Sequence, residues 1–71
     1  MAHRNLAAER VRLGMNQKAL AEHFGISYGT MVRYEANIGQ APGDFIMKAA
    51  EFFGCSAEYL LDLTEERLPK R

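Results

Sequence analysis

The sequence is nearly free of cysteine. Cys55 stands alone, so no internal disulfide can form, and one cysteine with two distant histidines gives none of the ligand spacings of a zinc finger. We therefore expect a reduced, cytoplasmic protein with no structural metal and no cofactor. Cys55 itself is interpreted as a small buried apolar residue rather than a redox switch.

Long apolar runs are missing too. No segment approaches the ~20 apolar residues that a membrane-spanning helix needs, which argues against membrane insertion and secretion. Strand-like alternation of apolar and polar residues is also absent, which favours an all-α fold. The 71 residues suffice for one small domain, with a core over about 4–63 and a loosely composed tail over 64–71.

The chain also lacks net charge, which argues at first against nucleic acid, because affinity for DNA depends largely on neutralising phosphates. The total conceals an asymmetry. Residues 1–34 carry five Arg or Lys against two Glu, a net of +3, and residues 35–71 carry four against seven acids, a net of −3. Such a split indicates a basic face for an acidic partner, with a random distribution of surface charge as the alternative.

What the sequence does contain is a series of short helical patterns. The expected helices run over about 3–13, 17–24, 28–36, 44–53 and 57–63. Their expected N-caps are Asn16, Ser27 and Ser56, and their expected ends are marked by Gly14, Gly25 and Gly54. The apolar residues that share a helix face are Leu6 and Leu13, which lie on one side with Arg10 and have Val11 beside them, then Leu20, Ala21 and Phe24, then Met31 and Tyr34, then Ile46, Ala49, Ala50 and Phe53, and finally Tyr59, Leu60 and Leu63.

The segment ANIGQAPG, residues 36–43, is expected to be a loop because it is rich in Asn, Gly and Pro. It contains no Lys or Arg. We interpret Ile38 in this loop as part of the core rather than of a protein contact.

The second and third expected helices, joined by a short turn, form the unit on which the interpretation of function depends. Two steeply crossing helices need a small residue where they approach and a residue free to adopt positive φ at the turn, and Ala21 and Gly25 meet these demands. By spacing alone, an ordinary helical hairpin is the alternative to a helix-turn-helix. The stretch RVRLGMNQKALAEHFGISYGTMVRYE resembles the lambda-repressor-like DNA-binding domains of the Cro/C1 type, or XRE family, found in phage and bacterial regulators. The resemblance continues through Leu63 and implies a compact fold of five helices.

The resemblance implies a recognition helix whose base-contacting residues are Tyr28, Gly29, Thr30, Val32 and Arg33. Arg33 is able to make a bidentate contact to guanine, or else to bind a phosphate. Val32 suits the methyl group of thymine, Tyr28 offers its ring to a base or its hydroxyl to a phosphate, and Thr30 either reads a methyl group or only covers helix surface. Gly29 costs about 1 kcal/mol relative to alanine in a helix. We favour slightly a functional reason, close approach to the groove, over a merely tolerated glycine.

The resemblance also implies contacts to the DNA backbone. The residues concerned are Asn16, Gln17, Lys18, Ser27, Arg10, Asn37 and Gln40. Arg10 and Glu35 match positions that form a structural ion pair between the first and third helices, and Arg10 is also long enough to reach a phosphate. Gln17 has the simpler interpretation of an exposed helix former.

The function expected from these features is that of a repressor. It would bind a palindromic operator in double-stranded DNA as a homodimer, with half-sites ~34 Å apart and dimer contacts around residues 54–59. The alternative is a protein-interaction module that keeps the fold and has lost DNA binding. An enzyme is not expected, because His3 and His23 lack nucleophile or metal partners, and no small-molecule ligand is indicated.

Overall fold

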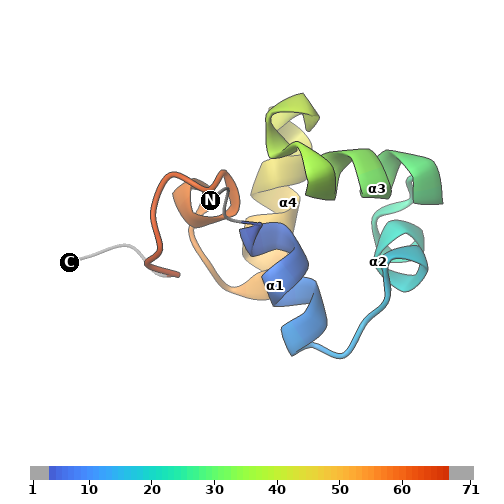
Figure 1. Cartoon of the computed structure of the whole chain (residues 1–71), viewed down its shortest axis with the longest axis horizontal. Helices are drawn as coiled ribbons and strands as arrows, with labels where there is room; N and C mark the ends of the chain where they lie inside the picture. Colours follow the sequence, from blue (N-terminus) through green and yellow to red (C-terminus); the bar gives the residue numbers. More distant parts are fainter. Residues whose placement is uncertain (1–3, 68–71) are drawn as a thin grey trace.

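The computed structural model describes residues 4–67, and within them the chain contains helices and no strand (Figure 1). The elements are α1 (Asn5–Arg12), α2 (Gln17–Phe24), α3 (Tyr28–Ala36), the 3-10 turn η1 (Ile38–Gln40), α4 (Gly43–Phe53) and α5 (Ala57–Leu60). The predicted all-α architecture with five α-helices is confirmed. No helix in this part of the chain is long and apolar enough to span a membrane.

The three predicted N-caps form. The side-chain oxygens of Asn16, Ser27 and Ser56 each accept a hydrogen bond from the amide three residues later, at 2.7, 3.1 and 3.1 Å. Each bond satisfies an amide that has no partner inside its helix, and such a cap contributes about 1 kcal/mol. At the other ends of α2 and α4, Gly25 and Gly54 adopt the left-handed conformation with φ of 69° and 71°, which side chains disfavour.

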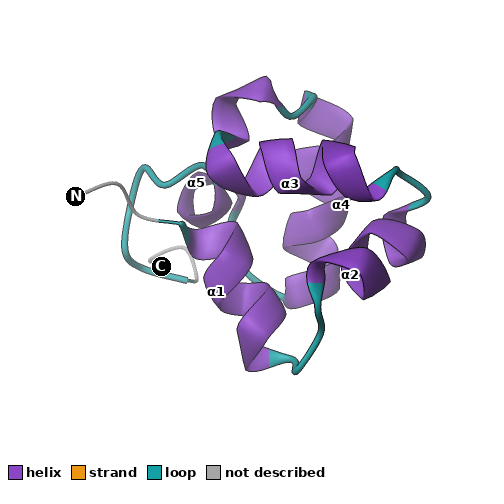
Figure 2. Cartoon of the chain, turned by 45° about the vertical axis from the view of Figure 1, so that its right-hand side comes forward, coloured by secondary structure: helices purple, strands orange, loops and turns teal. Residues whose placement is uncertain are grey.

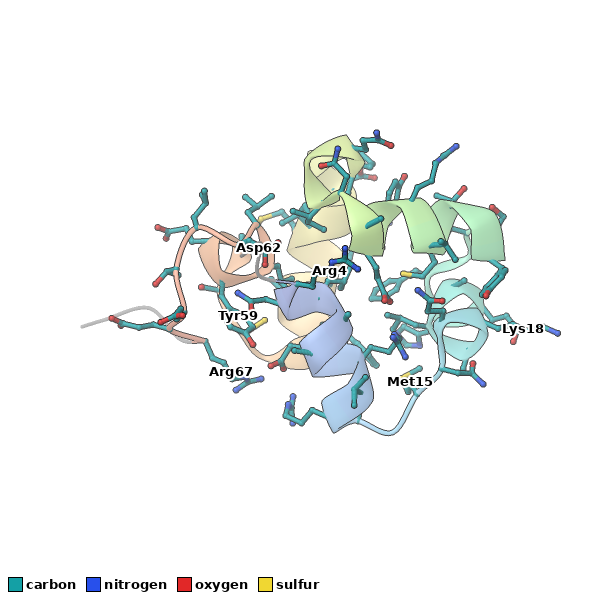
Figure 3. The ribbon with its side chains drawn as sticks, in the orientation of Figure 1. Arg4, Met15, Lys18, Tyr59, Asp62 and Arg67 are labelled. Carbon is teal, nitrogen blue, oxygen red and sulfur yellow. The ribbon has the colours of Figure 1, made fainter. Side chains whose placement is uncertain are left out.

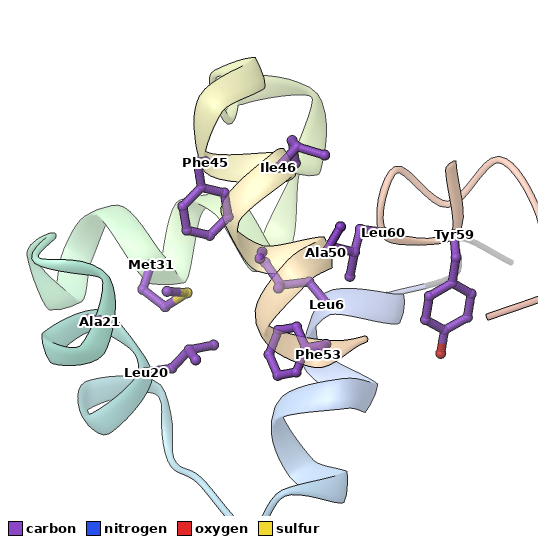
Figure 4. Packing of buried hydrophobic residues seen from close by; sticks show 11 residues of the cluster. Leu6, Leu20, Ala21, Met31, Phe45, Ile46, Ala50, Phe53, Tyr59 and Leu60 are labelled. Atoms are coloured by element: carbon purple, nitrogen blue, oxygen red, sulfur yellow. The ribbon is translucent and has the colours of Figure 1, made fainter. Parts of the chain in front are cut away.

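The hydrophobic core is built around α4 (Figure 4). This helix buries Phe45, Ile46, Ala49, Ala50 and Phe53. The other α-helices contribute Leu6, Leu20, Ala21, Met31, Tyr59 and Leu60. Complete burial of a large apolar side chain contributes about 1.5–3 kcal/mol, so helices too short to be stable alone are held by packing. All of these residues except Phe45 lie on the faces predicted from the sequence.

α1 is shorter and less buried on one side than predicted. It begins at Asn5, and the predicted start at residue 3 lies outside the described residues. The helix ends at Arg12, with Leu13 as its C-cap. Val11 and Leu13 are exposed, because the buried side of the helix faces the core through Leu6 instead.

The prediction that the fifth helix extends to residue 63 is wrong. α5 ends at Leu60, and Asp62 adopts a left-handed conformation with φ of 63°. The carboxylate of Asp62 accepts the amide of Asn5 at 2.9 Å, which offsets the unfavourable backbone conformation and turns the chain toward α1. As a result Leu63, predicted to share the buried face, is 72% exposed.

Two smaller predictions concern the loop and the cysteine. Ile38 is half-buried and packs against the core, as predicted, at the start of the 3-10 turn that the sequence did not indicate. Cys55 is also half-buried and packs against the core, where burial raises the pKa of its thiol. Both residues therefore contribute apolar surface to the interior.

Figure 2 shows how the helices lie around α2 and α3: α3 runs above α2, and α1 lies to the left of α2. The turn between α2 and α3 is closed by the amide of Ile26, which donates to the carbonyl of Ala21 at 3.0 Å. Ala21 is buried in α2, the helix that packs against α3. This packing leaves one face of α3 open to solvent.

Candidate nucleic-acid interface

The open face of α3 carries the side chains predicted to touch bases. Tyr28 is 56% exposed, and Gly29 and Arg33 are exposed as well. Because Gly29 and Arg33 are four residues apart, they lie one above the other on the same face. Val32, expected to be exposed, is only half-exposed, since it lies beside the buried stripe formed by Met31 and Glu35.

Thr30 is engaged with the helix cap. Its amide donates to the Oγ of Ser27 at 3.1 Å, and the hydroxyl of Ser27 donates to the Oγ1 of Thr30 at 2.8 Å. Thr30 is half-buried, whereas Ser27 is exposed. These two hydroxyls therefore stabilise the start of α3 in the unbound protein.

Gly29 is not required by the fold. Its φ lies outside the left-handed region, and a Cβ added at this position would meet no atom within 4 Å. Neither backbone conformation nor internal packing accounts for a glycine here. Any functional reason for Gly29 must come from a molecule that approaches α3 from outside.

An open depression joins α3 to the start of α2. Its volume is about 560 Å³, and it is lined by Arg10, Asn16, Gln17, Lys18 and Tyr28. It therefore brings together four of the predicted backbone contacts and one predicted base contact. The amides of the first turn of α2 have no partner inside the helix, and the positive end of the helix dipole lies here.

The predicted partners Arg10 and Glu35 lie in direct contact. Arg10 Nε is 2.8 Å from Glu35 Oε2, and Arg10 Nη2 is 3.2 Å from Glu35 Oε1. Arg10 Nη1 also donates to the carbonyl of Met15 at 2.9 Å. All three guanidinium nitrogens of Arg10 thus bind protein atoms, which ties α1 to α3 and to the turn that precedes α2.

Gln17 takes part in the same network, which sequence reasoning missed. Its Nε2 donates to Glu35 Oε1 at 3.1 Å, so the side chain points inward to α3. Glu35 is a buried carboxylate and accepts from both Gln17 and Arg10. The resemblance indicated the pair of Arg10 and Glu35. Nothing in the sequence around Gln17 indicated that its side chain would be a third member of this network.

Asn37 and Gln40 lie apart from the depression. Both are exposed on the segment after α3. The Oδ1 of Asn37 accepts the amide of Gly39 at 3.1 Å, which starts the 3-10 turn. These two residues, together with Lys18 and Arg33, present polar groups to solvent around the helix-turn-helix.

Comparison with known proteins was made for the whole chain. Residues 6–60 match the family model described as helix-turn-helix, which covers most of the sequence and nearly all of the described helices. No curated protein and no solved structure gives a match. The matched range includes both helices of the unit described above and the Arg10–Glu35 pair. The chain therefore belongs to the Cro/C1-type helix-turn-helix family of DNA-binding transcription regulators.

Proposed function

We propose that this protein is a repressor that binds a palindromic operator in double-stranded DNA as a homodimer. The observation that carries the proposal is the solvent-exposed face of α3, on which Tyr28, Gly29 and Arg33 stand free, next to the depression at the start of α2. In a helix-turn-helix, the second helix enters the major groove and the first crosses the backbone.

Base reading is assigned to the exposed residues of α3. Arg33 has the geometry for two hydrogen bonds to the O6 and N7 of guanine, which discriminate by ~1–3 kcal/mol. Tyr28 stands at the edge of the depression, where its ring reaches a base or its hydroxyl reaches a phosphate. Val32 and Thr30, being half-buried, offer methyl groups at the margins of the contact.

Backbone binding is assigned to the depression. A phosphate placed there meets the amides of the first turn of α2, apart from that of Ala19, which Asn16 caps, and it meets the exposed ammonium group of Lys18. The side chains of Gln17 and Arg10 are held inward by their hydrogen bonds to Glu35. They therefore stabilise the walls of the depression more than they donate to the phosphate. Ser27, Asn16, Asn37 and Gln40 add neutral polar contacts, which are weaker than charged ones.

Dimer formation follows from the small number of cations. The loop 36–43 contains no Lys or Arg, and Arg10 is already paired. A single domain with few phosphate contacts binds weakly, because each neutralised phosphate adds to affinity. Two copies bound to adjacent half-sites about one helical turn apart, ~34 Å, would double the number of phosphate contacts and so raise the affinity. Occupancy of such a site blocks polymerase without any further domain.

The test is selection of duplexes from a randomised pool, followed by binding of the winner at several salt concentrations. The proposal expects a palindromic winner and an affinity that falls linearly on a log–log plot against salt. A scrambled duplex of the same composition is the control. Enrichment of a non-palindromic site would contradict the dimer. No enrichment at low salt would contradict DNA binding and favour the interaction module suggested by the zero net charge.

A further inference from the structure

Glu9 is the most deeply buried charged residue of the described chain, with 2% of its surface exposed. Its carboxylate has three partners. Arg67 donates from Nε to Oε2 at 2.9 Å and from Nη2 to Oε1 at 2.7 Å, Arg12 Nη2 donates to Oε1 at 2.9 Å, and the hydroxyl of Tyr59 donates to Oε2 at 3.1 Å. Such a carboxylate is expensive to bury and becomes favourable only when fully paired.

Residues 61–67, which we call the C-terminal strap, are fixed to the rest of the molecule near both of their ends. Near the first end, Asp62 Oδ1 accepts the amide of Asn5 and the carbonyl of Thr64 accepts from Asn5 Nδ2, at 2.9 and 3.3 Å. At the second end, the carbonyl of Arg67 accepts the amide of Ser56 at 2.6 Å. The tail that the sequence describes as loose is therefore bound to α1 and to the start of α5, as far as residue 67.

The side chain of Arg67 completes the second attachment. Besides Glu9, its Nη2 donates to the carbonyl of Phe53, the last residue of α4, at 2.8 Å. Arg67 and Tyr59 lie beside α1, on the side of the molecule away from Lys18 (Figure 3). Arg67 thus joins α1 to the end of α4.

The opposite side of α1 holds the recognition helix. Glu9, bound by the strap, is followed directly by Arg10, which forms the ion pair with Glu35 of α3. A helix of eight residues is short and rigid, so a movement of α1 at Glu9 also moves the base of the Arg10 side chain. The strap and α3 are therefore connected through adjacent residues of one helix.

We propose that Arg67 is a positioning residue for DNA binding: by holding Glu9 it fixes α1 at the place where Arg10 pairs with Glu35, and so fixes the orientation of α3. This role rests on the proposed function, because it concerns how α3 meets DNA. The coupling of the strap to the Arg10–Glu35 pair does not depend on DNA. The coupling and its effect on DNA binding are therefore tested in two separate measurements.

The experiment compares Arg67→Gln with Arg12→Gln in the full chain. The two arginines are matched: both donate to Glu9 Oε1 and to the carbonyl of Phe53, and each substitution removes one positive charge. Arg12 belongs to α1 itself, so its loss leaves the strap attached. Arg67→Lys keeps the charge and serves as the conservative variant, and it also provides a measurable chain if Arg67→Gln does not fold.

The first measurement needs no DNA. Hydrogen exchange of the Arg10 Nε–H is followed by nuclear magnetic resonance at a temperature where every variant is folded. We expect Arg67→Gln to accelerate this exchange about tenfold, the effect of losing a charged hydrogen-bond pair, while Arg12→Gln leaves it nearly unchanged. The exchange rate in Arg67→Lys should lie between the rates in these two variants. Equal acceleration in the two Gln variants, or none in either, overturns the coupling.

The second measurement uses the duplex selected from the random pool. We expect Arg67→Gln to weaken binding about three- to tenfold and Arg12→Gln to leave it unchanged. In a Glu35→Gln background, where the ion pair is already lost, Arg67→Gln should weaken binding no further although it still lowers the melting temperature. An additive effect in that background overturns the positioning role.

Failure of the unsubstituted chain to bind any duplex overturns the proposed function and this role together. The exchange measurement still decides whether the strap is coupled to the Arg10–Glu35 pair.

Discussion

Arg10 and Glu35 join α1 to α3 through two hydrogen bonds, of 2.8 and 3.2 Å, in a place where little of either side chain reaches solvent. A buried carboxylate that loses its cation keeps the cost of desolvation without the compensating attraction. The pair therefore links α1 directly to α3, and the loss of either partner should cost stability.

Replacement of Arg10 by methionine should destabilise the domain by about 3 kcal/mol, because Glu35 is left buried with Gln17 as its remaining side-chain partner. Urea unfolding followed by circular dichroism measures the loss. The double variant Arg10→Met, Glu35→Leu removes both charges and should recover much of it. If the double variant is as unstable as the single one, the unpaired carboxylate is not the cause.

Gly29→Ala should stabilise the free protein by up to about 1 kcal/mol, because alanine is the better helix former and its Cβ enters open space. The same variant should bind the selected duplex less tightly if α3 approaches the groove closely at this position. Thermal unfolding and a binding titration on one preparation compare the two effects. A variant that is more stable and binds equally well would show that Gly29 is only tolerated.

Arg33→Ala should abolish the preference for guanine at one position of each half-site and cost about 1–3 kcal/mol for the selected duplex. Repeating the selection with the variant shows whether the preference is lost. A uniform weakening on all duplexes, with the selected sequence unchanged, would instead assign Arg33 to a phosphate.

Lys18→Gln should lower affinity on all duplexes alike and reduce the slope of log affinity against log salt by about 1 for each protomer. The exposed ammonium group at the depression is the physical reason. Titrations at four salt concentrations measure the slope. The matched control is Lys48→Gln, which removes a Lys from α4 outside the depression and should leave the slope unchanged.

Acid should weaken the fold through Glu9. Hydrogen bonds from Arg67, followed by those from Arg12 and Tyr59, outweigh burial and lower the pKa of Glu9 from 4.5 to about 2. A carboxyl group with a lowered pKa in the folded state contributes stability that is complete above its unfolded pKa and is lost as the pH falls from 4.5 toward 2. The loss should be about 3 kcal/mol over this range.

Urea unfolding at pH 7, 4.5, 3 and 2 tests this dependence. Glu9→Gln should be less stable than the unsubstituted chain at pH 7 and should lose the part of the slope that belongs to Glu9. Glu22→Gln, at an exposed position of α2, is the control and should keep the slope. An unchanged slope in Glu9→Gln would mean that other carboxylates govern acid unfolding.

Much of the fold follows from local rules that the sequence displays. Asn16, Ser27 and Ser56 cap helices as predicted, because an N-cap depends only on residues within one turn. The buried face of α4 follows from its spacing of apolar residues. For α3, periodicity identified Met31 as buried, and the resemblance identified the neighbouring residues as candidates for DNA contact.

The parts that the sequence did not predict depend on contacts between distant residues. Asp62 ends α5 because it meets Asn5, 57 positions earlier, and no window of sequence contains both. The same is true of Arg67 and Glu9, which lie 58 positions apart. The burial of Glu9 could not be predicted either, since periodicity describes one helix and carries no information about which segment covers it.

The contact between Asn5 and Asp62 also brings the beginning and the end of the domain together. Domains whose ends meet tolerate insertion into a host chain and rearrangement of the chain order, because the new connection is short. In this molecule the junction lies on the side away from Lys18 (Figure 3). A reporter or a second domain fused at the junction would therefore leave the proposed DNA-binding face accessible, which makes the protein suited to use as a portable module.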